Sequence, residues 1–174
     1  MMRWGYRFGQ FLMRTRAGDA AVARETAQAA LPGAAYELFQ EMSPGDQVHA
    51  VCVFRAVGAA RGASVDLLQA ALLHDVGKAR ASLTLPRRAL IVFLESLGGG
   101  LLERLASPDP KSWRYPFYVH VHHAELGALR CREAGCSPLT VALVRNHKAP
   151  VDDVVADAEL KEGLVALKQA DDTC

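Results

Sequence analysis

The sequence predicts an all-α protein that folds as one domain. Alanine, leucine, arginine and glutamate dominate it, whereas valine, isoleucine and tyrosine do not form the alternating runs that are typical of strands. Its 174 residues suffice for one sizeable hydrophobic core. Because no internal repeat, low-complexity tract or long linker divides the chain, we expect a single bundle of helices.

Start and stop signals place the expected helices in order. Asp19 is expected to cap the first helix. Ser43-Pro44 and Ser137-Pro138 each combine a capping side chain with proline at the first helical position, and Ser64 is a further cap. Gly135 is expected to stop the helix before it. The expected helices cover residues 19–30, 34–42, 44–60, 65–74, 86–97, 101–106, 116–134, 138–147 and 159–171.

The amino-terminal residues form a separate basic and aromatic segment. Trp4, Phe8, Phe11 and Leu12 recur at helical spacing, and arginines interrupt them, which excludes the uninterrupted apolar core of a signal peptide. This segment predicts either a first helix packed on the domain, which we favour, or a helix that binds a membrane surface or a partner protein. No run is long enough for a transmembrane helix, and the net charge of +1 gives no indication of a nucleic-acid partner.

Four cysteines occur, and no two of them form a Cys-x-x-Cys pair: Cys52, Cys131, Cys136 and Cys174. Without such a pair, a zinc site built on Cys131 and Cys136 has no partner ligands. Since no secretory context is visible either, we expect four reduced thiols in a cytoplasmic protein.

The strongest chemical signal is His74-Asp75, at the end of an apolar helical run. A buried ionised carboxylate is costly without a partner, and a divalent metal ion is one. Imidazole nitrogen and carboxylate oxygen suit Zn, Fe, Mn or Co. Gly77 is expected to relax the helix end so that both side chains reach one ion. Further candidate ligands lie within or at the ends of other expected helices, as in bundles whose metal sites are built from facing helices. They are His49, His123, His147 and Asp171.

The ordered pattern His49, His74-Asp75 and Asp171 resembles the H…HD…D signature of the HD-domain superfamily of metal-dependent phosphohydrolases. The segment Ala70-Ala71-Leu72-Leu73-His74-Asp75-Val76-Gly77-Lys78 is similar to the family's usual AALLHDIGK. The resemblance covers about residues 43–171 and implies an HD-domain helical bundle over 43–174. Residues 1–42 would then be a helical extension packed on the same domain.

Two further segments resemble the HD members that bind two metal ions. His123 is followed by Gly127-Ala128 as in their H-x-x-x-G-A segment, and His147 matches their next histidine. The resemblance implies that His49, His74, Asp75 and Asp171 hold one ion, and that Asp75 bridges to a second held by His123 and His147. Bacterial symmetrical diadenosine tetraphosphate hydrolases share this layout, and HD-GYP phosphodiesterases share part of it. The chain lacks the Gly-Tyr-Pro motif of the HD-GYP phosphodiesterases and the His-Thr motif usual in the diadenosine tetraphosphate hydrolases. We therefore do not assign the substrate of either group to this chain.

Several nearby residues allow two interpretations. His122 competes with His123 as the ligand, and the glycine four residues on favours His123. His120 and His122 are then either groups that support the ligands or the substrate phosphate, or plain surface histidines. Lys78 is either a catalytic cation that binds phosphate or a solvated lysine at a helix end. The loop of residues 111–115 interleaves cations with aromatics, which either stack a base or simply pack.

The resemblance implies a phosphohydrolase that uses a metal-activated water on a phosphate ester or anhydride of a nucleotide or similar small molecule. Asp75 and Lys78 are the residues expected to be catalytic. The alternatives are a di-iron oxygenase of the HD type and a non-catalytic nucleotide-binding module. The sequence does not distinguish among Fe, Mn, Co, Mg and Zn, and it does not indicate an oligomeric state.

Overall fold

The computed structural model describes residues 17–59, 62–81, 84–154 and 157–174, and the expected amino-terminal helix lies outside them. The all-α prediction is confirmed, since the described residues form helices and no strand. The α-helices are α2 (Ala17–Ala30), α3 (Gly33–Gln40), α4 (Pro44–Gly58), α5 (Val65–Leu73), α6 (Leu85–Ser96), α7 (Gly99–Leu105), α8 (Tyr115–Glu133), α9 (Pro138–Asn146) and α10 (Ala158–Thr173). Two short 3₁₀ helices, η1 (Val76–Arg80) and η2 (Val151–Asp153), were not expected.

The serine caps start helices as predicted. The hydroxyls of Ser43, Ser64 and Ser137 each accept the backbone N–H three residues on, at 3.3, 3.2 and 3.0 Å respectively. Gly135 follows the end of α8 with a φ of 78°, a left-handed conformation that favours glycine. Asp19 is not a cap: α2 begins two residues earlier, so Asp19 lies in its first turn.

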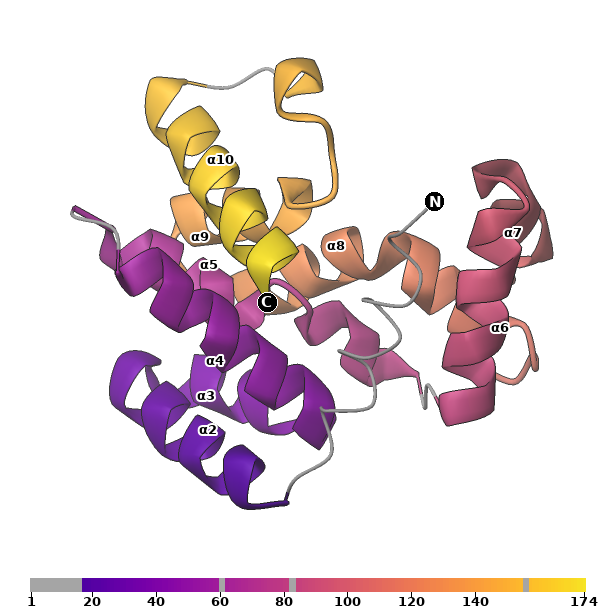
Figure 1. Cartoon of the computed structure of the whole chain (residues 1–174), viewed down its shortest axis with the longest axis horizontal. Coiled ribbons are helices and arrows are strands. Elements are labelled where there is room, and N and C mark those ends of the chain that lie inside the picture. The colour runs from indigo at the N-terminus through magenta and orange to yellow at the C-terminus, as the bar shows by residue number, and fades with distance from the viewer. Residues whose placement is uncertain (1–16, 60–61, 82–83, 155–156) are drawn as a thin grey trace.

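Most of the helices share one hydrophobic core, with α5 at its centre (Figure 1). Ala70, Ala71, Leu72 and Leu73 of α5 are all fully buried. Burying a leucine stabilises the fold by about 2 kcal/mol, so the end of α5 is held firmly where His74 follows it. Residues of α2 and α3, which precede the expected boundary at residue 43, enter the same core through side chains such as Phe39.

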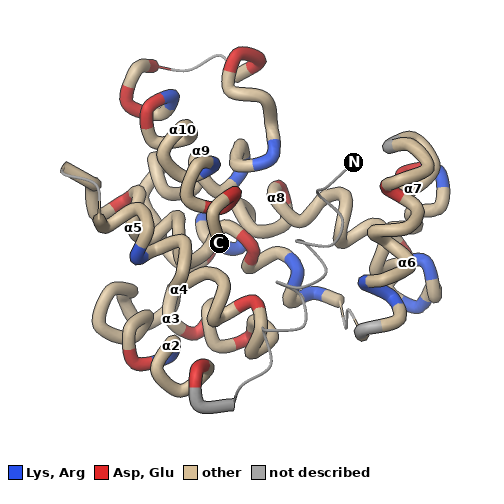
Figure 2. Tube along the Cα trace, in the orientation of Figure 1, with Lys and Arg blue, Asp and Glu red and all other residues tan. Residues whose placement is uncertain are grey.

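Helices α6 and α7 pack against the start of α8 around a small second cluster, made by Ile91, Leu94, Leu102 and Phe117. This pair lies to the right in Figure 1, away from α2, α3 and α10. Charges of both signs are interspersed among the helices, in keeping with the small net charge (Figure 2). Among the described helices, none combines the length and apolar character that crossing a bilayer requires.

Candidate metal centre

The fold gathers all six predicted ligands at one place, where all but the partly exposed Asp171 are buried. Each comes from a different helix or from the turn between α5 and η1, which lets a small chain surround one point with donor atoms. His49 lies in α4, His74 caps the end of α5, Asp75 immediately precedes η1, His123 lies in α8, His147 caps the end of α9 and Asp171 lies in the last turn of α10.

The first ligand group consists of His49, His74 and Asp75, which offer donor atoms within 4.8 Å of one another. Asp171 extends this group. Its Oδ1 lies 2.8 Å from His49 Nε2 and 3.7 Å from His74 Nε2. His74 Nε2 lies 3.6 Å from Asp75 Oδ2. Two imidazoles and two carboxylates therefore face one another, a donor set that suits a divalent transition metal.

The second ligand group consists of Asp75, His123 and His147, whose donor atoms also lie within 4.8 Å of one another. Asp75 Oδ1 lies 3.4 Å from His123 Nε2 and 3.8 Å from His147 Nε2. Because Oδ2 faces the first group and Oδ1 the second, Asp75 is the residue common to both. These two buried groups could bind metal ions.

Four buried polar atoms of this centre have no hydrogen-bond partner among the described residues. They are Nε2 of His74, His123 and His147, and Oδ1 of Asp75. A buried polar atom without a partner costs about 1–3 kcal/mol, so four together at one place would be a large penalty. Since all four are atoms that ligate metals, the centre fits the divalent cations that the sequence analysis expected.

The orientation of the three histidines is set by their own helices. The Nδ1 atom of each lies close to the backbone carbonyl three residues earlier, at 2.9 Å for His74, 2.6 Å for His123 and 2.7 Å for His147. A carbonyl only accepts, so Nδ1 carries the proton in each ring. Each neutral imidazole therefore presents the lone pair of Nε2 to the centre, as metal-ligating histidines do.

Burial and charge keep these side chains in the protonation states that metal binding needs. Burial lowers the pKa of His74 and of His123, and it lowers the pKa of His147 to about 3. Burial acts to raise the pKa of Asp75, but Lys78 and the surrounding histidines outweigh it and hold that pKa well below its usual range. Near neutral pH the imidazoles are thus neutral and Asp75 is ionised.

Lys78 contacts the centre directly. Its Nζ lies 2.6 Å from Asp75 Oδ2, and its side chain remains 19% exposed. It also lines a pocket of about 320 Å³ together with Ser43, Thr84 and Arg88. Lys78 therefore lies between the buried carboxylate and a space open to solvent.

The 3₁₀ helix after Asp75 packs unusually close to α8. A Cβ atom added to Gly77 would lie 2.0 Å from the carbonyl oxygen of His123 and 2.8 Å from the backbone nitrogen of Gly127. Arg130, which sequence analysis missed, donates from α8 to the carbonyl of Val76 at 3.3 Å. The expected role of Gly77 in relaxing the end of α5 is wrong, because α5 ends at residue 73 and Gly77 instead permits this close approach.

Burial distinguishes the neighbouring histidines of α8. His123 is buried in the centre, whereas His122 is half-buried and packs on Tyr118 with ring centroids 4.4 Å apart. His120 Nε2 lies 2.9 Å from Glu95 of α6. In the loop of residues 111–115, Trp113 is exposed and contacts Phe117 edge-on. These side chains pack along α8 outside the ligand groups.

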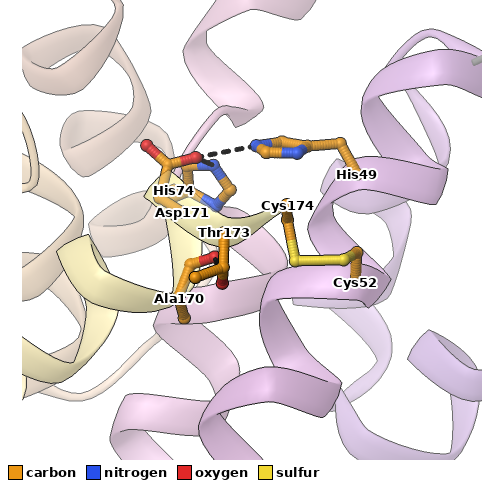
Figure 3. The surroundings of a disulfide bond; sticks show 7 residues. All are labelled: His49, Cys52, His74, Ala170, Asp171, Thr173 and Cys174. Atoms are coloured by element: carbon orange, nitrogen blue, oxygen red, sulfur yellow. Dashed lines mark hydrogen bonds and ion pairs between the residues drawn. A yellow bond between two sulfur atoms is a disulfide. The ribbon is translucent and has the colours of Figure 1, made fainter. Parts of the chain in front are cut away.

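The expectation of four reduced thiols is wrong for two of them. Cys52 of α4 and Cys174, which follows α10, form a disulfide, whereas Cys131 and Cys136 are free (Figure 3). The expected cytoplasmic location rested on reduced cysteines, so it loses that support. One signal was present in the sequence: each bonded cysteine lies three residues after a predicted ligand, His49 or Asp171.

Comparisons of the chain with protein-family models, with curated proteins and with solved structures find no match. Relatives therefore supply no function for this chain.

Proposed function

We propose that this protein is a metal-dependent phosphohydrolase of the HD type, which binds two divalent ions and hydrolyses a phosphate ester or anhydride of a nucleotide or similar small molecule. The observation that carries the proposal is the convergence of four unpartnered buried ligand atoms, one of them on Asp75, at the junction of two ligand groups. A carboxylate shared between two sets of histidines is the arrangement expected of a two-metal site.

In this proposal the first ion is held by His49, His74, Asp75 and Asp171. The second is held by Asp75, His123 and His147. The short contacts within each group and the orientation of Nε2 toward the centre support this division. Bound ions would lower the pKa of a coordinated water and neutralise charge on phosphoryl oxygens.

In this proposal Asp75 and Lys78 position the ions and the substrate. Asp75 stays ionised and presents one oxygen to each ligand group. Lys78, 2.6 Å from Asp75 and partly exposed, supplies a cation that can turn from the carboxylate to a phosphoryl oxygen of the substrate. The adjoining pocket receives the rest of the substrate. A cation beside the ligands favours an anionic substrate, such as a phosphate ester or anhydride.

The test pairs metal analysis of anaerobically purified protein with a hydrolysis screen over nucleotides and dinucleoside polyphosphates, using Mn²⁺, Co²⁺ or Mg²⁺ without oxygen. We expect close to two ions per chain and release of phosphate or nucleotide. His74→Ala and Asp75→Ala should lose both metal and activity. Unchanged metal content in these variants would refute the site, and turnover that requires oxygen and releases no phosphate would favour the oxygenase.

A matched pair of variants tests the second ligand group. His123→Ala should lose one ion and most of the activity, because it removes a buried Nε2 that faces Asp75. His122→Ala, one position earlier in α8 and packed on Tyr118, should keep both ions. Equal metal loss in the two variants would contradict this assignment.

A further inference from the structure

The disulfide and the first ligand group link the same two helices. Cys52 lies three residues after His49 in α4, and Cys174 lies three residues after Asp171 of α10. Residues three apart on a helix share a face, so the sulfur bridge lies one turn from the contact between His49 and Asp171. Figure 3 shows the two links side by side, with His74 beyond them. The Cys52–Cys174 bond therefore helps to set how far α10 lies from α4 at the ligands.

The elements that carry the second ligand group are not joined by a disulfide. Asp75, His123 and His147 come from the start of η1, from α8 and from the end of α9. Close packing holds those elements together, as the contact of Gly77 with α8 illustrates. Among the described ligands, Asp171 alone lies on α10, and its Oδ1 is the atom 2.8 Å from His49. A shift of α10 would thus act directly on the first ligand group, and it would reach the second indirectly, through contacts such as those of Lys168 with the backbone carbonyls of His147 and Ala149.

Reagents in solution can also reach the Cys52–Cys174 disulfide, whereas they cannot reach the buried ligands. Cys52 is exposed and Cys174 partly so, whereas His49 and His74 are buried. A reductant can therefore reach the sulfur atoms without entering the metal centre. Accessible disulfides of this kind are the ones that exchange with thiols and serve regulation.

We propose that Cys52 and Cys174 form a redox-sensitive modification site that sets the affinity of the first ligand group for its ion. The proposal rests on the metal centre of the proposed function. A thiolate of an external dithiol attacks one sulfur and releases the other cysteine as a thiolate. The second thiol of the dithiol then displaces the first cysteine and closes its own disulfide. Two electrons and two protons pass from the dithiol to Cys52 and Cys174, and the reverse exchange restores the bond.

We expect reduction of the disulfide to lower the affinity for one of the two ions selectively. Loss of groups that position metal ligands typically lowers metal affinity by about 10–100-fold. Reduction of the disulfide should therefore lower the affinity of the first ligand group for its ion about tenfold. The affinity for the second ion should change much less, because the contact of α10 with that group is to the backbone carbonyl of His147. Calorimetric titration of the full metal-stripped chain with Mn²⁺, before and after reduction by tris(2-carboxyethyl)phosphine, measures both affinities. Thiol titration of the same samples should count two free thiols before reduction and four after it, since Cys131 and Cys136 are already free.

Two variants make the test specific. Cys52→Ser/Cys174→Ser should show the weaker first affinity with or without reductant. Cys136→Ser, which removes a partly buried free thiol, should respond to reductant as the wild type does. A His123→Ala/His147→Ala variant should retain only the ion that responds. Because reduction is also performed on the folded wild-type chain, a folding defect in any variant does not decide the outcome.

The outcomes separate the two proposals. Two ions bound with the same affinities in both redox states would overturn the redox site and leave the metal centre intact. A response to reductant that persists in Cys52→Ser/Cys174→Ser, or that falls on the second ion, would also overturn it. Failure of the oxidised wild type to bind any ion would overturn the proposed function and the redox site with it.

Discussion

Substituting alanine for Gly77 should damage the second ligand group through the backbone of α8, without changing any ligand side chain. The added Cβ would lie 2.0 Å from the carbonyl oxygen of His123 and 2.8 Å from its carbonyl carbon. These are backbone atoms of a helix, so they cannot rotate away as a side chain can. Either η1, which directly follows Asp75, or α8, which carries His123, must therefore move.

The size of the effect follows from the contact distance. Real Cβ contacts essentially never fall below 3.0 Å, so the 2.0 Å contact requires a separation of about 1 Å or more. Overpacking of this kind costs about 1–3 kcal/mol in a packed interior. Asp75 Oδ1 lies 3.4 Å from His123 Nε2, close to the separation of about 3.4 Å that two ligands of a tetrahedral ion have, and an added 1 Å would exceed it. We therefore expect much weaker binding of the second ion together with reduced stability.

Metal titration and urea unfolding of Gly77→Ala measure the two effects separately. Gly58→Ala is the matched control: its Cβ would meet only Leu68, at 3.6 Å, an ordinary contact, so it should keep wild-type metal content. If Gly77→Ala bound two ions with wild-type affinity and unfolded at the wild-type urea concentration, the close approach of η1 to α8 would not be what positions the centre.

Two further predictions concern charge. The metal-free protein should lose stability as pH falls from about 6.5 towards 3, because unfolded His147 takes up a proton near 6.5 while the folded residue resists until about 3. Each pH unit in that window costs about 1.4 kcal/mol per such histidine, and His147→Gln should flatten the profile in urea unfolding with a chelator present. A profile unchanged by the substitution would contradict this. Lys78→Met should destabilise the metal-free protein by about 3 kcal/mol, because it leaves Asp75 buried without its cation. Added Mn²⁺ should then raise the melting temperature of Lys78→Met more than that of the wild type, and an equal rise would contradict the pairing.

Local signals predicted the helices well. Serine caps and the proline after them act within one turn, so Ser43, Ser64 and Ser137 determine where their helices begin whatever packs nearby. Asp19 failed as a predicted cap because α2 continues two residues before it. The short 3₁₀ helix of residues 76–80 was missed because its shape depends on α8, which lies far from it in the sequence.

The gathering of the six candidate ligands was predicted from their places within or at the ends of helices and from an ordered resemblance. Spacing along the sequence does not determine which histidine of a helix faces inward, and burial is what distinguishes His123 from His122. The Cys52–Cys174 bond was missed because 122 residues separate the two cysteines, and cysteine pairing over such a distance depends on the fold. The ion pair between Lys78 and Asp75 could not be predicted from the sequence either, since the direction of a lysine side chain at a helix end depends on the nearest buried charge.

The segment His74-Asp75-Val76-Gly77-Lys78 joins the two ligand groups because each position makes a different contact. His74 faces the first group, and Asp75 presents one oxygen to each. The absence of a side chain at Gly77 brings α8, and with it His123, against the same turn. Lys78 balances the buried carboxylate until a cation replaces it. Lengthening this turn by one residue would therefore separate Asp75 from His123 and uncouple the two groups, even with every ligand still present in the chain.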